Sequence, residues 1–150
     1  MAMHNLMRNV AIIHRTSQVT GTTADKNDAG IDTTPYTGVA WLVSLSTLQT
    51  TGASIKLQES ASSGFSTSAV SDLTGTSISM TTTIEDGVAI LDLYKPGKQW
   101  VRLVYVSVNT SDVFDSIIAL GYLPKEAPVT HSTADLIGAE YHSRPSTGTA

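Results

Sequence analysis

The chain has 150 residues, a formal net charge of −4 at pH 7 and no cysteine. Charged residues make up only 15% of it, and its 9 Lys and Arg residues form no basic stripe of the kind that neutralises nucleic-acid phosphates. Thiol catalysis and a cysteine-bound zinc ion are excluded, the start carries no secretory cleavage signal, and no segment reaches the ~18 apolar residues of a membrane span. We therefore expect one domain, made in the cytoplasm, with no nucleic-acid or membrane partner.

Residues 1–37 are predicted to form an N-terminal arm and a first strand. Leu6 to Arg15 is a short apolar segment. Thr16 to Thr37 is polar and rich in turn-forming residues, which indicates loops and short crossings.

The next predicted strand, Val39 to Leu45, is apolar on both faces, which is typical of a strand inside a sandwich or under an interface. Thr50-Thr51-Gly52 is the expected turn before a strand from Ala53 to Gln58. In that strand Ile55 and Leu57 alternate with polar residues, so we expect it to be half-exposed.

The stretch from Val88 to Leu123 gives the strongest strand signals. Val88 to Tyr94 and Trp100 to Val108 are predicted to pair as a hairpin through a type II turn at Lys95-Pro96-Gly97-Lys98. Arg102 indicates that one face of the second strand is exposed to solvent or has a polar partner. A Thr-rich strand from Ile78 to Ile84 is expected to form another hairpin with Val88 to Tyr94, because Asp86-Gly87 is a hairpin signal. Ile117 to Leu123 is a third strand, which Pro124 ends.

Seven or eight short strands separated by turn signals predict an all-β fold, a jelly-roll-like antiparallel β-sandwich with extended N- and C-terminal arms. The predicted sandwich core spans residues 38–124, and the Pro- and Ser/Thr-rich residues 125–150 are predicted to form an extended C-terminal arm of the same domain.

Both arms carry isolated apolar residues that are candidate partner contacts. They are Leu6, Ile12, Ile13, Leu136, Ile137 and Tyr141. One interpretation is that they pack back on the parent domain. The other is that one or both arms reach a neighbouring subunit and become ordered on contact.

The sequence offers little catalytic chemistry, so we predict no enzyme activity, no cofactor and no metal site. The four histidines, His4, His14, His131 and His142, show neither metal-ligand spacing nor a triad pattern. Asp25 to Gly30 matches the start of a calcium loop but lacks the later ligands, and an Asx-type turn is the favoured interpretation.

Four motifs follow one another through the middle and later half of the chain. They are Lys56-Leu57-Gln58, Asp72-Leu73-Thr74-Gly75, Trp100-Val101-Arg102, and Ala119-Leu120-Gly121-Tyr122 before a proline. In this order they resemble a family of small virion proteins that tailed bacteriophages encode with their head genes.

The resemblance implies a capsid decoration or cement protein on the outside of the virion. Such a protein binds the major capsid protein, links neighbouring subunits and stabilises the head without chemistry. Closed symmetry favours a homodimer or homotrimer, between which the sequence does not choose. The alternative is a carbohydrate- or receptor-binding β-sandwich of a phage tail or fibre. In that case Trp41, Trp100 and Tyr105 are the aromatic candidates for sugar stacking, provided that they are exposed.

Overall fold

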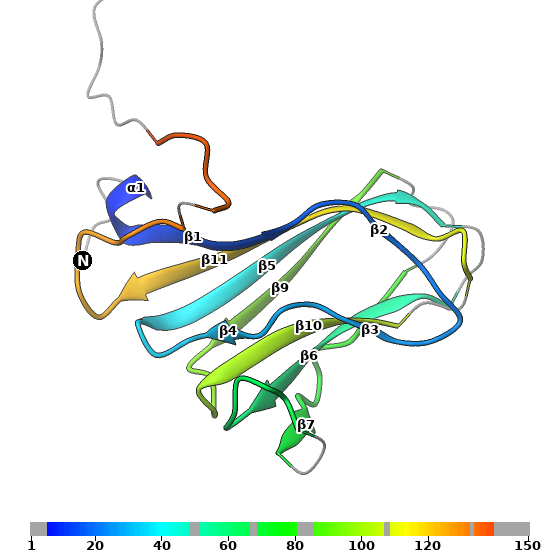
Figure 1. Cartoon of the computed structure of the whole chain (residues 1–150), viewed down its shortest axis with the longest axis horizontal. Helices are drawn as coiled ribbons and strands as arrows, with labels where there is room; N and C mark the ends of the chain where they lie inside the picture. Colours follow the sequence, from blue (N-terminus) through cyan, green and yellow to red (C-terminus); the bar gives the residue numbers. More distant parts are fainter. Residues whose placement is uncertain are drawn as a thin grey trace, which may run out of the picture.

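The computed structural model describes residues 6–48, 52–66, 69–80, 86–106, 109–132 and 134–139. They form two antiparallel β-sheets packed face to face, which confirms the predicted all-β sandwich (Figure 1). A four-residue helix, α1 (Leu6–Asn9), precedes the first strand and was not predicted. The turn at Thr50-Thr51, most of the Thr-rich strand after Ser79, and the residues His4, Tyr141 and His142 lie outside the described residues.

We call the two sheets sheet A and sheet B. Sheet A has the strand order β1 (Val10–Thr16), β11 (Val113–Pro124), β5 (Tyr36–Thr47) and β9 (Val88–Tyr94), and β2 (Val19–Thr20) also pairs with β11. Sheet B has the order β3 (Lys26–Asn27), β10 (Trp100–Val106), β6 (Ser54–Ser60) and β7 (Val70–Asp72). Two short strands complete it, β4 (Ile31–Asp32) beside β10 and β8 (Ile78–Ser79) beside β6.

The chain passes from β1 in sheet A through β3 and β4 in sheet B to β5 in sheet A, and from β5 onward the long strands alternate between the sheets, which is the topology of a jelly roll. From β5 the chain passes to β6 in sheet B, and from β9 in sheet A to β10 in sheet B and back to β11. Each crossing lets consecutive apolar strands bury one face against the opposite sheet.

The hairpin predicted between Val88 to Tyr94 and Trp100 to Val108 is wrong for this reason. β9 pairs with β5, and β10 pairs with β6, so Lys95 to Lys98 connects the two sheets instead of two neighbouring strands. The turn also differs from type II, because Lys95 and not Gly97 has a positive φ, of 54°. The N–H of Lys95 donates to the carbonyl of Thr37 on β5. Burial of both strands against opposite sheets outweighs the local turn preference. Of the strand predicted from Ile78 to Ile84, the part Ile78–Ser79 pairs with β6, and residues 81–84 lie outside the described residues.

The core follows the predicted alternation. The side chains of Val39, Trp41 and Val43 on β5 are fully buried, and they face Leu57 and Leu103 in the same core cluster. At one end the rings of Tyr105 and Phe114 pack with centroids 5.0 Å apart at 54°, an edge-tilted contact that joins β10 to β11.

The beginning and the end of the described chain lie side by side at one end of sheet A (Figure 1). The N–H of Val129 donates to Arg8 O, and that of Ser132 donates to Ile12 O, both over 3.1 Å. The ring of His131 accepts from the N–H of Ile12 at Nδ1 (3.3 Å), and its Nε2 lies 3.0 Å from Met7 O. Residues 129–132 therefore pack back on β1 and cover its edge.

Candidate functional site

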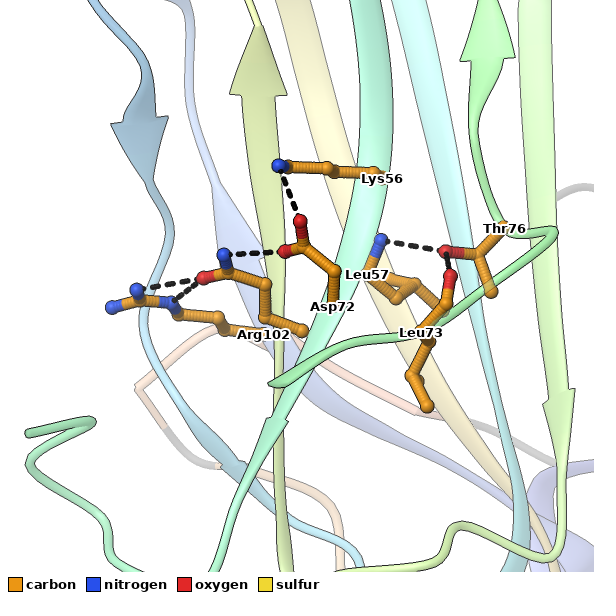
Figure 2. A network of polar contacts seen from close by, with 7 residues as sticks. Lys56, Leu57, Asp72, Leu73, Thr76 and Arg102 are labelled. Carbon is orange, nitrogen blue, oxygen red and sulfur yellow. Dashed lines mark hydrogen bonds and ion pairs between the residues drawn. The ribbon is translucent and has the colours of Figure 1, made fainter. Parts of the chain in front are cut away.

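The outer face of sheet B carries a polar network in which the charged groups are paired with one another (Figure 2). Arg102 donates from Nε and Nη2 to Gln58 Oε1 (3.0 and 2.8 Å), and the Gln58 amide donates to Asp72 Oδ1 (2.7 Å). Lys56 Nζ lies 2.9 Å from Asp72 Oδ2. Arg102 is also stacked 4.4 Å from the centroid of the Phe65 ring.

This network joins β6, β7 and β10, and it explains what the sequence motifs do. The hydrogen bonds from Gln58 and Lys56 lower the pKa of Asp72 below its ordinary value. Nearby, Thr76 Oγ1 accepts from the N–H of Leu57 and donates to Leu73 O, which pins the loop after β7 (Figure 2). Three of the four motifs that carry the resemblance contribute residues to this network, and these residues hold the strands together. Arg102 has the polar partner that the sequence predicted.

The outer face of sheet A is mostly apolar. We define it by the side chains that point away from sheet B: Val10, Ile12, Arg15, Ala40, Leu42, Ser44, Val88, Ile90, Asp92, Tyr94, Ser116, Ile118, Leu120 and Tyr122. The strand registers place them in rows across the sheet, such as Ile90, Leu42 and Ile118 in one row. Val88, Ile90 and Tyr94 are 62%, 59% and 56% exposed.

Two charged residues belong to this face, Arg15 on the edge strand β1 and Asp92 on β9, and the carboxylate of Asp92 is already hydrogen-bonded. The hydroxyl of Tyr122 donates to Asp92 Oδ1 over 2.6 Å, reaching across β5. Burial and the Asp92 carboxylate raise the pKa of Tyr122 to about 12. The ring can pass over β5 because Gly38 lies beneath it; a Cβ there would come within 2.1 Å of Tyr122 Cζ. The exposed Arg15 pairs with Ile118 in the register and lies at the rim.

A second polar cluster, His14, Thr16 and Asp28, has a structural geometry. His14 Nε2 lies 2.8 Å from Thr16 Oγ1 and 3.2 Å from Asp28 Oδ1, and Thr16 Oγ1 donates to the same carboxylate oxygen over 2.7 Å. A hydrolytic triad needs the carboxylate and the hydroxyl on opposite ring nitrogens. Here both contact Nε2, so the cluster joins β1 to the loop after β3 instead.

The geometry also sets the protonation of this cluster. The hydrogen bond to Asp28 raises the pKa of His14 above its ordinary value, against the effect of burial. Burial alone would raise the pKa of Asp28, but hydrogen bonds from His14, Thr16 and the N–H of Ala29 lower it. A His14–Asp28 ion pair is therefore favoured in weakly acidic solution.

The predicted arm residues do not come together in one site. Leu6 is 60% exposed on α1, Ile137 is fully exposed, and Leu136 is half-buried. Ile12 belongs to the outer face of sheet A, whereas Ile13 packs against the core. Tyr141 lies outside the described residues.

Sequence analysis missed the part of the outer face that β5, β9 and β11 contribute. These strands are apolar on both sides, so the pattern of apolar and polar residues does not show which side the second sheet covers.

The described residues give little support for a metal site or for a sugar-binding site. Within them no three His, Asp or Glu side chains are grouped so that they could hold a metal ion, and the calcium-like segment uses Asp28 in the cluster above. Two of the aromatic candidates for sugar stacking, Trp41 and Tyr105, are buried in the core, and Trp100 is half-buried. No helix in the described ranges is long and apolar enough to cross a membrane.

Neither a scan against protein-family models nor a search of curated proteins found a match to this chain.

Proposed function

We propose that this protein is a structural virion protein that binds the outside of a bacteriophage capsid and cements neighbouring major capsid protein subunits. It acts without catalysis, and the outer face of sheet A is its contact surface. The motif resemblance supports the bacteriophage assignment. We choose this surface because the two outer faces differ. The outer face of sheet A exposes mostly apolar side chains, whereas the outer face of sheet B carries polar side chains that are paired with one another.

Burying the outer face of sheet A is favourable because it removes apolar side chains from water and desolvates few ions. Asp92 keeps its hydrogen bond from Tyr122 on docking, so no lone charge is buried at the centre. The outer face of sheet B would instead need Lys56, Asp72 and Arg102 to be desolvated together, at a cost that an exposed network does not recover.

The size of the face suits repeated weak contacts. Four strands about 4.8 Å apart and about 24 Å long give a face of roughly 450 Å². A stable pairwise complex usually buries about 800 Å² on each partner. One such contact is weak alone, but a shell presents many identical sites, and linked copies gain affinity through effective concentration. A cement protein can therefore bind tightly through a modest face.

Co-sedimentation with decoration-free, expanded capsid shells tests this function. The wild-type protein should saturate the shells at a fixed symmetric ratio. Ile118→Lys places a charge at the centre of the outer face of sheet A, away from β9, and should reduce shell affinity at least about tenfold. Thr74→Lys adds the same charge at an exposed turn of the sheet B side and serves as the matched control.

Two results would count against the proposal. One is that no wild-type protein binds the shells. The other is that Ile118→Lys binds as well as Thr74→Lys while both remain folded. Binding to virion tails or to glycans in place of shells would favour the receptor-binding alternative.

A further inference from the structure

Three of the four sheet edges are protected in ways that natural proteins use against strand pairing. On sheet B both edges end in strands of two or three residues, namely β3, β4, β7 and β8. On sheet A the β1 edge has a register shift between Ile12 and His14, and residues 129–132 hydrogen-bond along it.

The described residues give the fourth edge, that of β9, none of these protections. β9 is seven residues long, contains neither proline nor lysine, and pairs with β5 without a register shift. No described strand pairs with its other side. Asp92 is its only charged residue.

The hydrogen-bond pattern shows which backbone groups face outward. Lys95 N donates to Thr37 O, and Leu45 N donates to Gly87 O, so both of these opposite pairs are hydrogen-bonded pairs. Hydrogen-bonded and non-hydrogen-bonded pairs alternate in an antiparallel ladder. Gly87 and Lys95 belong to hydrogen-bonded pairs, so every second residue between them also bonds to β5. The N–H and C=O groups of the residues in between therefore point away from β5, and these residues are Val88, Ile90, Asp92 and Tyr94.

We propose that the open edge of β9 is a homodimer interface, in which β9 of a second copy adds antiparallel to it and joins the two A sheets. An isologous strand pair has two-fold symmetry, so it predicts a dimer and not a trimer. This inference does not depend on a capsid role, because it concerns the free protein.

One register fits the chemistry of the strand. When Val88 lies opposite Tyr94 of the second copy, and Ile90 opposite Asp92, all outward backbone groups are paired, with about eight interchain hydrogen bonds. Shifting the register by two residues in one direction places the two Asp92 side chains directly opposite each other, which is unfavourable. The opposite shift leaves Tyr94 beyond the end of the paired strand.

Charge complementarity favours a second copy over an unrelated strand. Asp86 precedes β9 and Lys95 follows it. Antiparallel pairing brings the start of one strand to the end of the other, so Lys95 of each copy lies opposite Gly87 of its partner, one residue from Asp86, at both ends.

A groove of about 420 Å³ adjoins the first half of this edge, and a dimer would help to cover it. Its lining is mostly apolar and comes from both sheets, including Leu45, Ile78, Met80 and Ala89. The dimer would also present the two outer faces of sheet A side by side as one bivalent surface.

Sedimentation velocity over a hundredfold range of protein concentration tests the dimer, and wild-type protein should reach twice the 15.8 kDa mass of one chain. Ile90→Pro removes an N–H that the monomer does not use and should weaken dimerisation about tenfold or more. Ile90→Ala keeps that N–H and should retain the dimer. Ile118→Lys, which impairs only shell binding, should dimerise normally.

A wild-type protein that stays monomeric, or an Ile90→Pro variant that dimerises as well as Ile90→Ala, would overturn the proposal. Hydrogen exchange on the wild type provides a test that does not depend on whether Ile90→Pro folds. The amides of Val88, Ile90, Asp92 and Tyr94 should exchange more slowly as protein concentration rises, and concentration-independent exchange at all four would also overturn it.

Discussion

Replacing Asp28 by alanine should destabilise the sandwich, because this carboxylate joins β1 of sheet A to the loop after β3 of sheet B. Its side chain is only 6% exposed, and it accepts hydrogen bonds from Thr16 Oγ1 and the N–H of Ala29 besides contacting His14. Removing a buried charged acceptor costs about 2–4 kcal/mol, since its donors lose their partner. For a domain of this size that corresponds to a fall in Tm of roughly 5–15 °C.

The same cluster predicts a pH dependence. The pKa of Asp28 lies below its ordinary value of 3.8, so its contribution to stability is present above that pH and is lost as the pH falls through the lowered pKa. The pKa of His14 lies above its ordinary value of 6.5, so its contribution is present below that pH and is lost as the pH rises through the raised pKa. Both contributions are therefore present together between about pH 4 and 6.5.

Thermal denaturation at a series of pH values measures both effects. The wild-type Tm should fall as the pH rises above about 6.5, and His14→Gln should flatten that fall, because glutamine cannot gain a proton. An Asp28→Ala protein whose Tm is within about 2 °C of the wild type, or a His14→Gln protein with an unchanged pH profile, would refute this account of the cluster.

Three other substitutions test separate parts of the structure. Gly38→Ala should displace the ring of Tyr122, whose pKa should then fall from about 12 toward its ordinary value of 10 in a spectrophotometric titration. Thr76→Val should cost about 1–3 kcal/mol in denaturant unfolding, because it leaves the buried N–H of Leu57 without its acceptor. His131→Ala should release residues 129–132, seen as faster local hydrogen exchange and proteolysis, with a Tm change of only a few degrees since the core is untouched.

The strands could be predicted from the sequence because each depends on a local pattern. Alternation along Ala53 to Gln58 and the apolar run from Trp100 were sufficient to place β6 and β10. Their partners could not be predicted in the same way. The turn at Lys95 to Lys98 gave a local hairpin signal, but pairing is decided by which arrangement buries both strands against opposite sheets.

The candidate site was harder to predict than the fold. Leu42 and Ile118 lie on strands that are apolar on both faces, and nothing local in the sequence shows that sheet B covers only one side of these strands. The pairing of His14 with Asp28 depends on a contact between the two sheets. The unprotected β9 edge becomes visible only by comparison with the other three edges.

Electron cryomicroscopy of shells saturated with the protein would test the central claim most directly. The account predicts that the outer face of sheet A, including Leu42, Ile118 and Leu120, lies against the major capsid protein, with the Lys56–Asp72–Arg102 face toward solvent. Density in which sheet B or the arms alone contact the shell, or shells without bound protein, would contradict it.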